Sequence, residues 1–122
     1  MGIFNSFKSK KGLSSLSQRE KEAMGAIALG ILGVKTGGRI RTNDPAVYSF
    51  FVDFFGVNSQ EEILPHLKNI MAIDQNSATA IVRAFTHRQQ DEFRLWMLDR
   101  IGDDNRTRIA LAFFLQSIGF KL

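Results

Sequence analysis

One segment, residues 44–57, restricts the possible folds of this chain more than any other, because it specifies both ends of a helix. It reads Asp-Pro-Ala-Val-Tyr-Ser-Phe-Phe-Val-Asp-Phe-Phe-Gly-Val. Asp44 is suited to cap the first turn, Pro45 to the first helical position, and Gly56 to the left-handed conformation that ends a helix. The large apolar side chains recur at three- and four-residue steps and share one face: Val47, Phe50, Phe51 and Phe54. Since burying each such side chain contributes about 1.5–3 kcal/mol, we expect this helix in the middle of the core.

The rest of the chain is also predicted to be helical, which makes the fold class all-α. With 122 residues, 44% of them hydrophobic, the chain is long enough for one domain with its own core. No segment shows the alternation that is typical of a β-strand. We therefore expect a compact single-domain bundle of about five to seven helices over residues 17–122, preceded by a flexible tail at residues 1–16.

Local signals predict where the other helices begin and end. Capping boxes at residues 17–20 and 59–62 predict two helix starts, and the first of these helices is expected to reach about residue 34. Pro65 predicts a kink, or a one-turn piece before a helix that ends near residue 71. Three further helices are expected at about residues 77–87, 89–101 and 106–118.

Glycine positions and apolar spacing predict which faces pack together. Gly25 and Gly30 both lie inside the first of these helices, where glycine lowers stability, so we expect both to allow a close approach by a neighbouring helix. The residues expected to face the core in two later helices are Ala80, Ile81, Ala84 and Phe85, and then Phe93, Trp96, Met97 and Ile101.

A repeated sequence pattern, called the internal echo below, suggests that the chain consists of two related halves. The pair Phe50-Phe51 precedes Gly56, and the pair Phe113-Phe114 precedes Gly119 at the same distance along the chain. The alternative is that the two Phe pairs match by chance, since the chain contains eleven Phe. The echo leaves open a bundle of two pseudo-repeated halves.

The positive charge is concentrated in the first third of the chain. Residues 1–42 carry eight Lys or Arg and two Glu, a net +6, whereas residues 43–122 carry eight Lys or Arg and ten Asp or Glu, a net −2. Such a field favours an acidic partner, which can be a phospholipid, a nucleic acid or a protein. The charge alone does not choose among the three.

The N-terminal tail has the composition of a membrane-contact segment. An apolar group that can share one helical face precedes a basic group, and together they comprise Ile3, Phe4, Phe7, Lys8, Lys10 and Lys11. An apolar wedge followed by lysines suits an anionic membrane surface. Gly2 and Ser6 also match the N-myristoylation pattern. The alternative is a solvated chain end.

Other features bear on where the protein works. There is no run of about 18–20 apolar residues that would span a bilayer, and no apolar stretch long enough for a secretory signal. The chain also lacks cysteine, as is common in a reducing compartment. We expect a cytoplasmic location, with attachment to the inner face of the membrane if the tail binds there.

A loop rich in glycine and positive charge is the predicted partner-binding element. Residues 34–43 contain Gly37-Gly38 beside three cations, Lys35, Arg39 and Arg41. These residues are suited to hold a phosphate or a carboxylate, although the spacing is not that of a Walker motif. The alternative is a solvated connection between helices.

Residues that would support catalysis or metal binding are few. His66 and His87 are the only imidazoles, and neither has a metal-ligand spacing. We interpret His66 as partly exposed and His87 as lying near a helix end that favours a cation. The best oxygen-ligand segment, Asp103-Asp104-Asn105, lacks the other ligands of a calcium loop and is better explained as a cap and turn. We therefore expect no enzymatic activity, no cofactor and no metal.

The segment from Gly37 to Asp44, followed by a Phe-rich helix that ends in Phe-Phe-Gly-Val57, resembles the tellurite-resistance protein TerB and its relatives. The resemblance covers roughly residues 20–122, and a second loop of the family corresponds to Gly102-Asp-Asp-Asn105. It implies an all-α domain of pseudo-duplicated helices, linked to stress responses near the membrane, whose acidic loop residues are thought to bind metal.

The acidic residues of that family pattern, Asp-Gly-x-Ile-Asp-x-x-Glu, are largely replaced here. Gly38 and Ile40 match, and Asp44 stands at the Glu position. Gly37 and Arg41, however, occupy the two Asp positions. The resemblance therefore implies a scaffold that has been kept and a metal site that has been lost.

Taken together, the sequence predicts a non-enzymatic binding or adaptor module. The basic loop would contact an acidic protein or an anionic membrane surface. The alternative is a nucleic-acid-binding protein that uses residues 8–41, although this segment has no helix-turn-helix and no interleaved aromatic residues. An enzyme would need a pocket of convergent titratable groups that the sequence does not indicate. The oligomeric state is left open.

Overall fold

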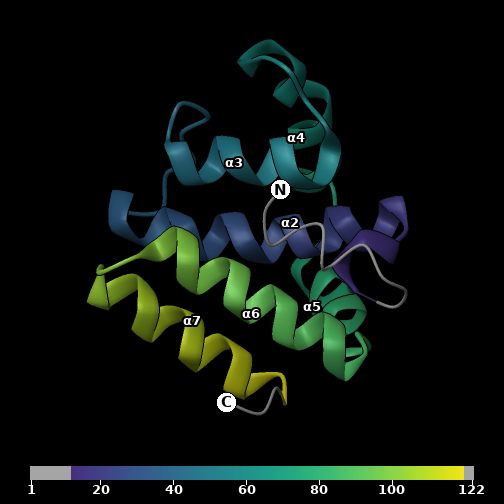
Figure 1. Ribbon diagram of the computed structural model, residues 1–122, viewed down its shortest axis with the longest axis vertical. Helices are drawn as coiled ribbons and strands as arrows, with labels where there is room; N and C mark the ends of the chain where they lie inside the picture. The colour runs from purple at the N-terminus through teal and green to yellow at the C-terminus, as the bar shows by residue number, and fades with distance from the viewer. Residues whose placement is uncertain (1–11, 120–122) are drawn as a thin grey trace.

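In the computed structural model, which describes residues 12–119, the chain folds into helices joined by short turns (Figure 1). Within this range there is no strand, and six α-helices confirm the predicted all-α bundle. The elements are η1 (Leu13–Ser15), α2 (Gln18–Leu32), η2 (Gly33–Thr36), α3 (Pro45–Phe55), η3 (Gln60–Glu62), α4 (Ile63–Met71), α5 (Gln75–Arg83), α6 (His87–Ile101) and α7 (Asn105–Ser117).

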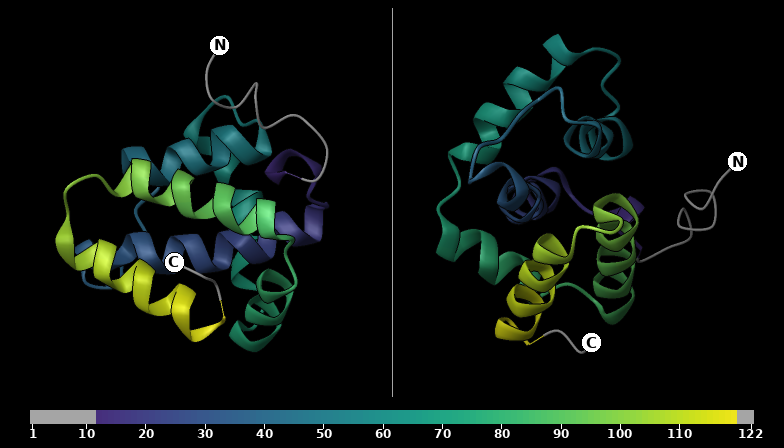
Figure 2. Two further views of the ribbon diagram at one scale, coloured as in Figure 1. Left: turned by 60° about the horizontal axis from the view of Figure 1, so that its bottom comes forward. Right: turned by 90° about the vertical axis from the view of Figure 1, so that its left-hand side faces the viewer.

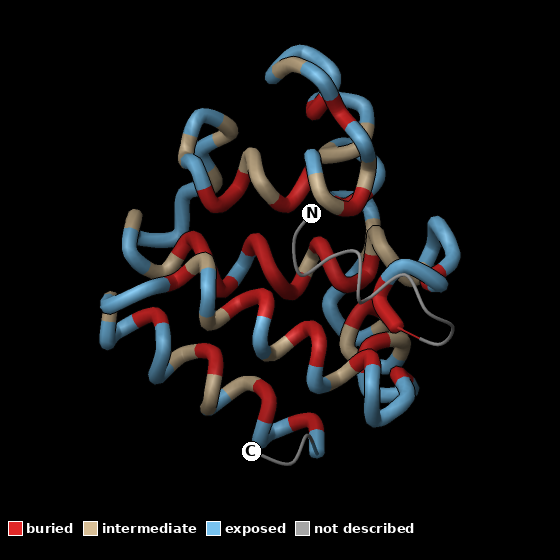
Figure 3. Tube along the Cα trace, in the orientation of Figure 1, coloured by how far each residue is buried: buried red, intermediate tan, exposed pale blue. Residues whose placement is uncertain are grey.

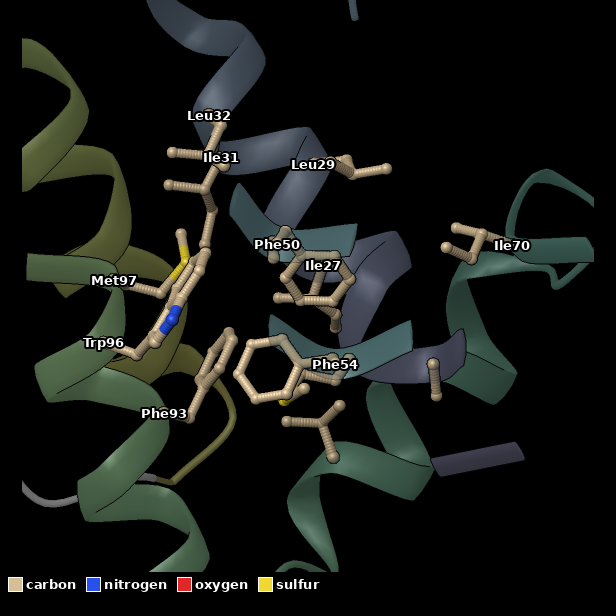
Figure 4. Close-up of a cluster of buried hydrophobic side chains, with 14 of the residues drawn as sticks. Ile27, Leu29, Ile31, Leu32, Phe50, Phe54, Ile70, Phe93, Trp96 and Met97 are labelled. Carbon is tan, nitrogen blue, oxygen red and sulfur yellow. The ribbon is translucent and has the colours of Figure 1, made fainter. Parts of the chain in front are cut away.

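Helix α3 has the ends and the buried face that the sequence predicts. Asp44 accepts a hydrogen bond from the amide of Ala46 at 2.9 Å, and Gly56 ends the helix with φ of 67°. The rings of Phe50 and Phe51 are completely buried. Phe50 packs with its ring centroid 4.9 Å from that of Phe54 and 5.6 Å from that of Trp96 (Figure 4). The aromatic face of α3 therefore forms a large part of the core.

The helix that is surrounded on most sides is α2 rather than α3. It packs against α3, α4, α5 and α7 and runs through the middle of the molecule (Figures 1 and 2). Small buried residues, Ala23, Gly25 and Ala28, let these neighbours come close. Figure 3 shows that buried positions follow α2 along most of its length.

Only one of the two glycines in α2 has the packing role that was predicted. A Cβ at Gly25 would lie 2.8 Å from Ile70 Cδ1 and 3.1 Å from the Phe50 ring, so a larger residue here would force these side chains to shift. A Cβ at Gly30 would meet no atom within 4 Å, and the residue is exposed. The predicted close approach at Gly30 is wrong.

The capping box predicted at residues 59–62 does not form. Ser59 makes no side-chain cap, and Glu62 instead accepts a hydrogen bond from the amide of Asn58 at 3.0 Å. The short turn η3 precedes α4, and Pro65 falls in the first turn of α4, where its missing N–H has no cost. The predicted one-turn piece and the end of the helix at Met71 are confirmed.

The helices at residues 77–87 and 89–101 begin earlier than predicted, because each has an N-cap that lies outside the predicted range. Asp74 caps α5, and Thr86 forms a capping box with Gln89 at the start of α6. The buried residues of α5 are Ala78 and Val82.

The prediction of which residues face the core is only partly correct. Ala80 and Ala84 are exposed, which contradicts the prediction for α5. Phe85 is buried, although in the turn after α5. All four residues predicted for α6 are buried: Phe93, Trp96, Met97 and Ile101.

Residues 12–16 belong to the helical domain rather than to a separate tail, which corrects the boundary predicted at residue 16. Leu13 and Leu16 are buried in the core. The amide of Leu13 donates to Glu92 Oε1 at 2.8 Å, and only 4% of Glu92 is exposed. The predicted membrane contacts all lie outside the described residues: Ile3, Phe4, Phe7, Lys8, Lys10 and Lys11.

The internal echo extends to the glycines but not to the phenylalanines. Gly56 and Gly119 both have positive φ and both follow a helix. Phe50 and Phe51 are fully buried, whereas 76% of Phe113 is exposed and Phe114 is half-buried. The two Phe pairs therefore pack differently.

Candidate functional site

The basic loop folds back tightly on the end of α2. The amide of Gly38 donates to the carbonyl of Gly33 at 2.8 Å, and the hydroxyl of Thr36 lies within hydrogen-bonding distance of the carbonyl oxygens of Gly33 and Arg39. Gly37 and Gly38 have φ of 72° and 93°, which residues with a Cβ rarely adopt. Hydrogen bonds therefore close the backbone over residues 33–39, the first part of the loop.

The three predicted partner-binding cations have different surroundings. Lys35 Nζ lies 3.5 Å from Asp44 Oδ2, and the same carboxylate caps α3. Arg39 and Arg41 are exposed, and among residues 12–119 neither forms an ion pair. Among the described residues, the loop thus presents two positive charges without an ion pair, while Lys35 pairs with Asp44.

An apolar pocket of about 440 Å³ lies beside this loop. Its walls come from five separate parts of the chain, which meet around the exposed side of α2. The residues that line it are Ala26, Ile27, Leu29, Gly30 and Ile31 of α2, Val34 and Ile40 of the loop, Ile70 and Met71 of α4, Ile73, Gln75 and Ala78 around the start of α5, and Phe114 of α7.

The pocket opens to solvent at Gly30 and at Met71, which is 65% exposed. Among the described residues that line it, only Gln75 has a polar side chain. Lys35, Arg39 and Arg41 do not themselves line the pocket, but each is next in sequence to a lining residue, Val34 or Ile40. The site is therefore an apolar pocket next to a cationic loop.

Sequence reasoning found the cationic loop and missed the pocket. The two signals available were Gly30, which was interpreted as a packing position, and Ile40, an apolar residue inside a polar loop. Neither signal shows which distant segments of the chain would form the walls of the pocket.

The two histidines lie on different helices and outside this site. The ring of His66 on α4 packs 4.7 Å from that of Phe55, and its Nδ1 has no hydrogen-bond partner among the described residues. His87 is the first residue of α6. The prediction that His87 lies at a helix end favouring a cation is wrong, because a helix N-terminus disfavours positive charge.

The acidic turn before α7 is held by local contacts. Asp104 accepts a hydrogen bond from the hydroxyl of Thr107, and Arg108 Nη1 donates to the carbonyl of Gly102 at 2.8 Å. Among residues 12–119 no group of three His, Asp or Glu side chains is close enough to hold a metal ion.

A scan against protein-family models and searches of curated proteins and of solved structures found no significant match to this chain. In the part of the chain that the structure describes, no helix is both long enough and apolar enough to cross a membrane.

Proposed function

We propose that this chain is a non-enzymatic binding module, TerB-like in scaffold and stress-related in role, that attaches to an acidic protein or to an anionic membrane surface. The observation that carries this proposal is the exposed pair Arg39 and Arg41, which form no ion pair among the described residues. A cation without an internal partner keeps its full attraction for an external anion.

Two further features support the proposal. The loop backbone is closed by the hydrogen bond from Gly38 to Gly33, so little conformational entropy is lost when a partner binds. The net +6 of residues 1–42 adds a long-range attraction toward an anionic surface. The basic N-terminal segment would act together with the loop on the same surface.

Flotation with vesicles of phosphatidylglycerol and phosphatidylcholine tests this function. Each Arg near an anionic surface contributes about 1 kcal/mol, so Arg39→Gln with Arg41→Gln should weaken vesicle binding about 30-fold. The matched control is Arg19→Gln with Arg83→Gln, which removes the same charge at two exposed helix positions away from the loop. The control should retain most of the binding.

A second full-length variant, with Lys8, Lys10 and Lys11 changed to Gln, measures the share of the N-terminal segment. The proposal fails if the variant with Arg39→Gln and Arg41→Gln binds anionic vesicles and an acidic protein as well as the control variant with Arg19→Gln and Arg83→Gln does. Binding to a DNA duplex that is tighter than to vesicles, with a steep salt dependence, would favour the nucleic-acid alternative instead.

A further inference from the structure

Gly30 is the feature that packing does not explain. It lies inside α2, where glycine lowers stability relative to alanine. Gly25 in the same helix packs closely against Ile70 and Phe50, but a Cβ at Gly30 would meet nothing within 4 Å. What the missing side chain does leave open is the pocket that Gly30 lines.

The position of Gly30 makes this opening central to the pocket. Ala26, Gly30 and Val34 follow one another at four-residue steps along the wall that α2 and the loop provide. A large side chain at position 30 would therefore extend over the middle of the pocket.

The lining suits a hydrocarbon better than a peptide. A buried peptide amide needs hydrogen-bond partners, and Gln75 is the only polar side chain that the described residues contribute to the walls. A hydrocarbon chain needs none. The volume of about 440 Å³ also falls within the range of roughly 300–1,000 Å³ that is typical of sites for whole small molecules.

The cations beside Ile40 in the sequence indicate the head group. Arg39 and Arg41 flank Ile40, whose side chain lines the pocket. The long stem of an arginine can lie along apolar surface while its guanidinium group remains in water. Guanidinium groups bind carboxylates through two parallel hydrogen bonds, which matches an anionic end outside an apolar pocket.

We propose that the pocket binds the hydrocarbon chain of a free long-chain fatty acid, whose carboxylate is held by Arg39 and Arg41. This inference rests on the cationic loop of the proposed function and adds a ligand of defined chemistry. The apolar walls select the chain, and the two arginines select its negative head group.

The test uses the full-length protein and the fluorescent fatty acid cis-parinarate, whose emission rises in an apolar site. We expect saturable binding that dodecanoate displaces at a concentration at least about tenfold lower than dodecyltrimethylammonium, which has the same chain and the opposite charge. Arg39→Gln with Arg41→Gln should remove most of this preference.

Gly30→Leu tests whether ligand binding depends on the pocket, independently of the stability of the fold. It should weaken cis-parinarate binding at least about tenfold by filling the opening, while the melting temperature stays unchanged or rises, because leucine favours a helix more than glycine does. Ala80→Leu is the matched control, since it adds the same side chain at an exposed position of α5 outside the pocket and should leave binding unchanged.

Each contrary result overturns the inference. Absence of saturable cis-parinarate binding would do so, as would normal binding by Gly30→Leu or equal displacement by the two dodecyl compounds. If the protein still floats with anionic vesicles in an arginine-dependent way while fatty acid does not bind, the fatty-acid site is wrong and the proposed binding module stands.

Discussion

The indole N–H of Trp96 donates a hydrogen bond to Asp53 Oδ2 at 2.9 Å and thereby joins α6 to α3. Arg100 Nη2 lies 3.0 Å from the same oxygen, and its guanidinium carbon lies 4.8 Å from the centroid of the Trp96 ring. Arg100 also donates to the hydroxyl of Ser49 at 2.8 Å. The apolar contact between α3 and α6 therefore ends in a polar cluster whose partners satisfy one another.

Asp53→Ala should lower the free energy of unfolding by about 1–3 kcal/mol, because the Trp96 N–H and the Arg100 guanidinium lose their acceptor in a part-buried site. Urea unfolding followed by circular dichroism measures the change. Asp99→Ala is the control: Asp99 also pairs with Arg100, but its side chain is 70% exposed, so its loss should be below about 1 kcal/mol. Equal losses would show that the cluster does not join the helices.

Phe51→Ala should lower the free energy of unfolding by about 3–5 kcal/mol, because it removes a fully buried ring and leaves a cavity. Phe113→Ala makes the same chemical change at a ring that is 76% exposed and should alter stability by about 0.5 kcal/mol or less. Thermal or urea unfolding of both variants compares them. An unchanged melting temperature for Phe51→Ala would contradict the placement of α3 in the core.

Helix α3 was predictable because its determinants are local. Asp44, Pro45 and Gly56 act within one turn of the helix ends, and the apolar face follows from a repeat that one helix contains. The starts of α5 and α6 depend equally on local caps, but Asp74 and Thr86 were not recognised as caps. The inner face of α5 depends instead on which side packs against α2, and local spacing does not specify this.

The pocket could not be predicted in the same way, because its walls come from segments that are far apart in the sequence. Nothing around Phe114 indicates that it lines the same pocket as Gly30 and Ile40. A glycine inside a helix has two opposite explanations, a close contact or an opening, and only the neighbouring atoms distinguish Gly25 from Gly30.

Gly25→Ala should destabilise the protein by about 1 kcal/mol. The new methyl group gains helix propensity worth about 0.5–1 kcal/mol, but it overlaps the buried side chains of Ile70 and Phe50, and overpacking costs about 1–3 kcal/mol. Gly30→Ala gains the same propensity without a clash and should stabilise by about 0.5–1 kcal/mol. Urea unfolding of the two variants should give opposite signs, and a shared sign would contradict the packing at one of the two positions.

Because of the cap of α5, the free energy of unfolding should depend on pH in the acid range. The amide of Ser77 donates to Asp74 Oδ1 at 2.9 Å and its hydroxyl to Oδ2 at 2.8 Å. These hydrogen bonds, the one from the backbone amide first, lower the pKa of Asp74 below its ordinary value of 3.8. A carboxylate with a lowered pKa in the folded state contributes stability that is fully present above the unfolded pKa and is lost as the pH falls through the folded value.

Asp74→Asn keeps an acceptor for the cap but cannot ionise. The wild-type protein should therefore be more stable than Asp74→Asn at about pH 6, and the difference should shrink as the pH is lowered from about 4 toward 2. Urea unfolding of both proteins at a series of pH values measures it. Ser77→Ala removes only the hydroxyl contribution, so the acid-dependent difference should become smaller without vanishing. A difference between wild type and Asp74→Asn that stays constant over the whole pH series would show that the charge of Asp74 does not stabilise the helix start.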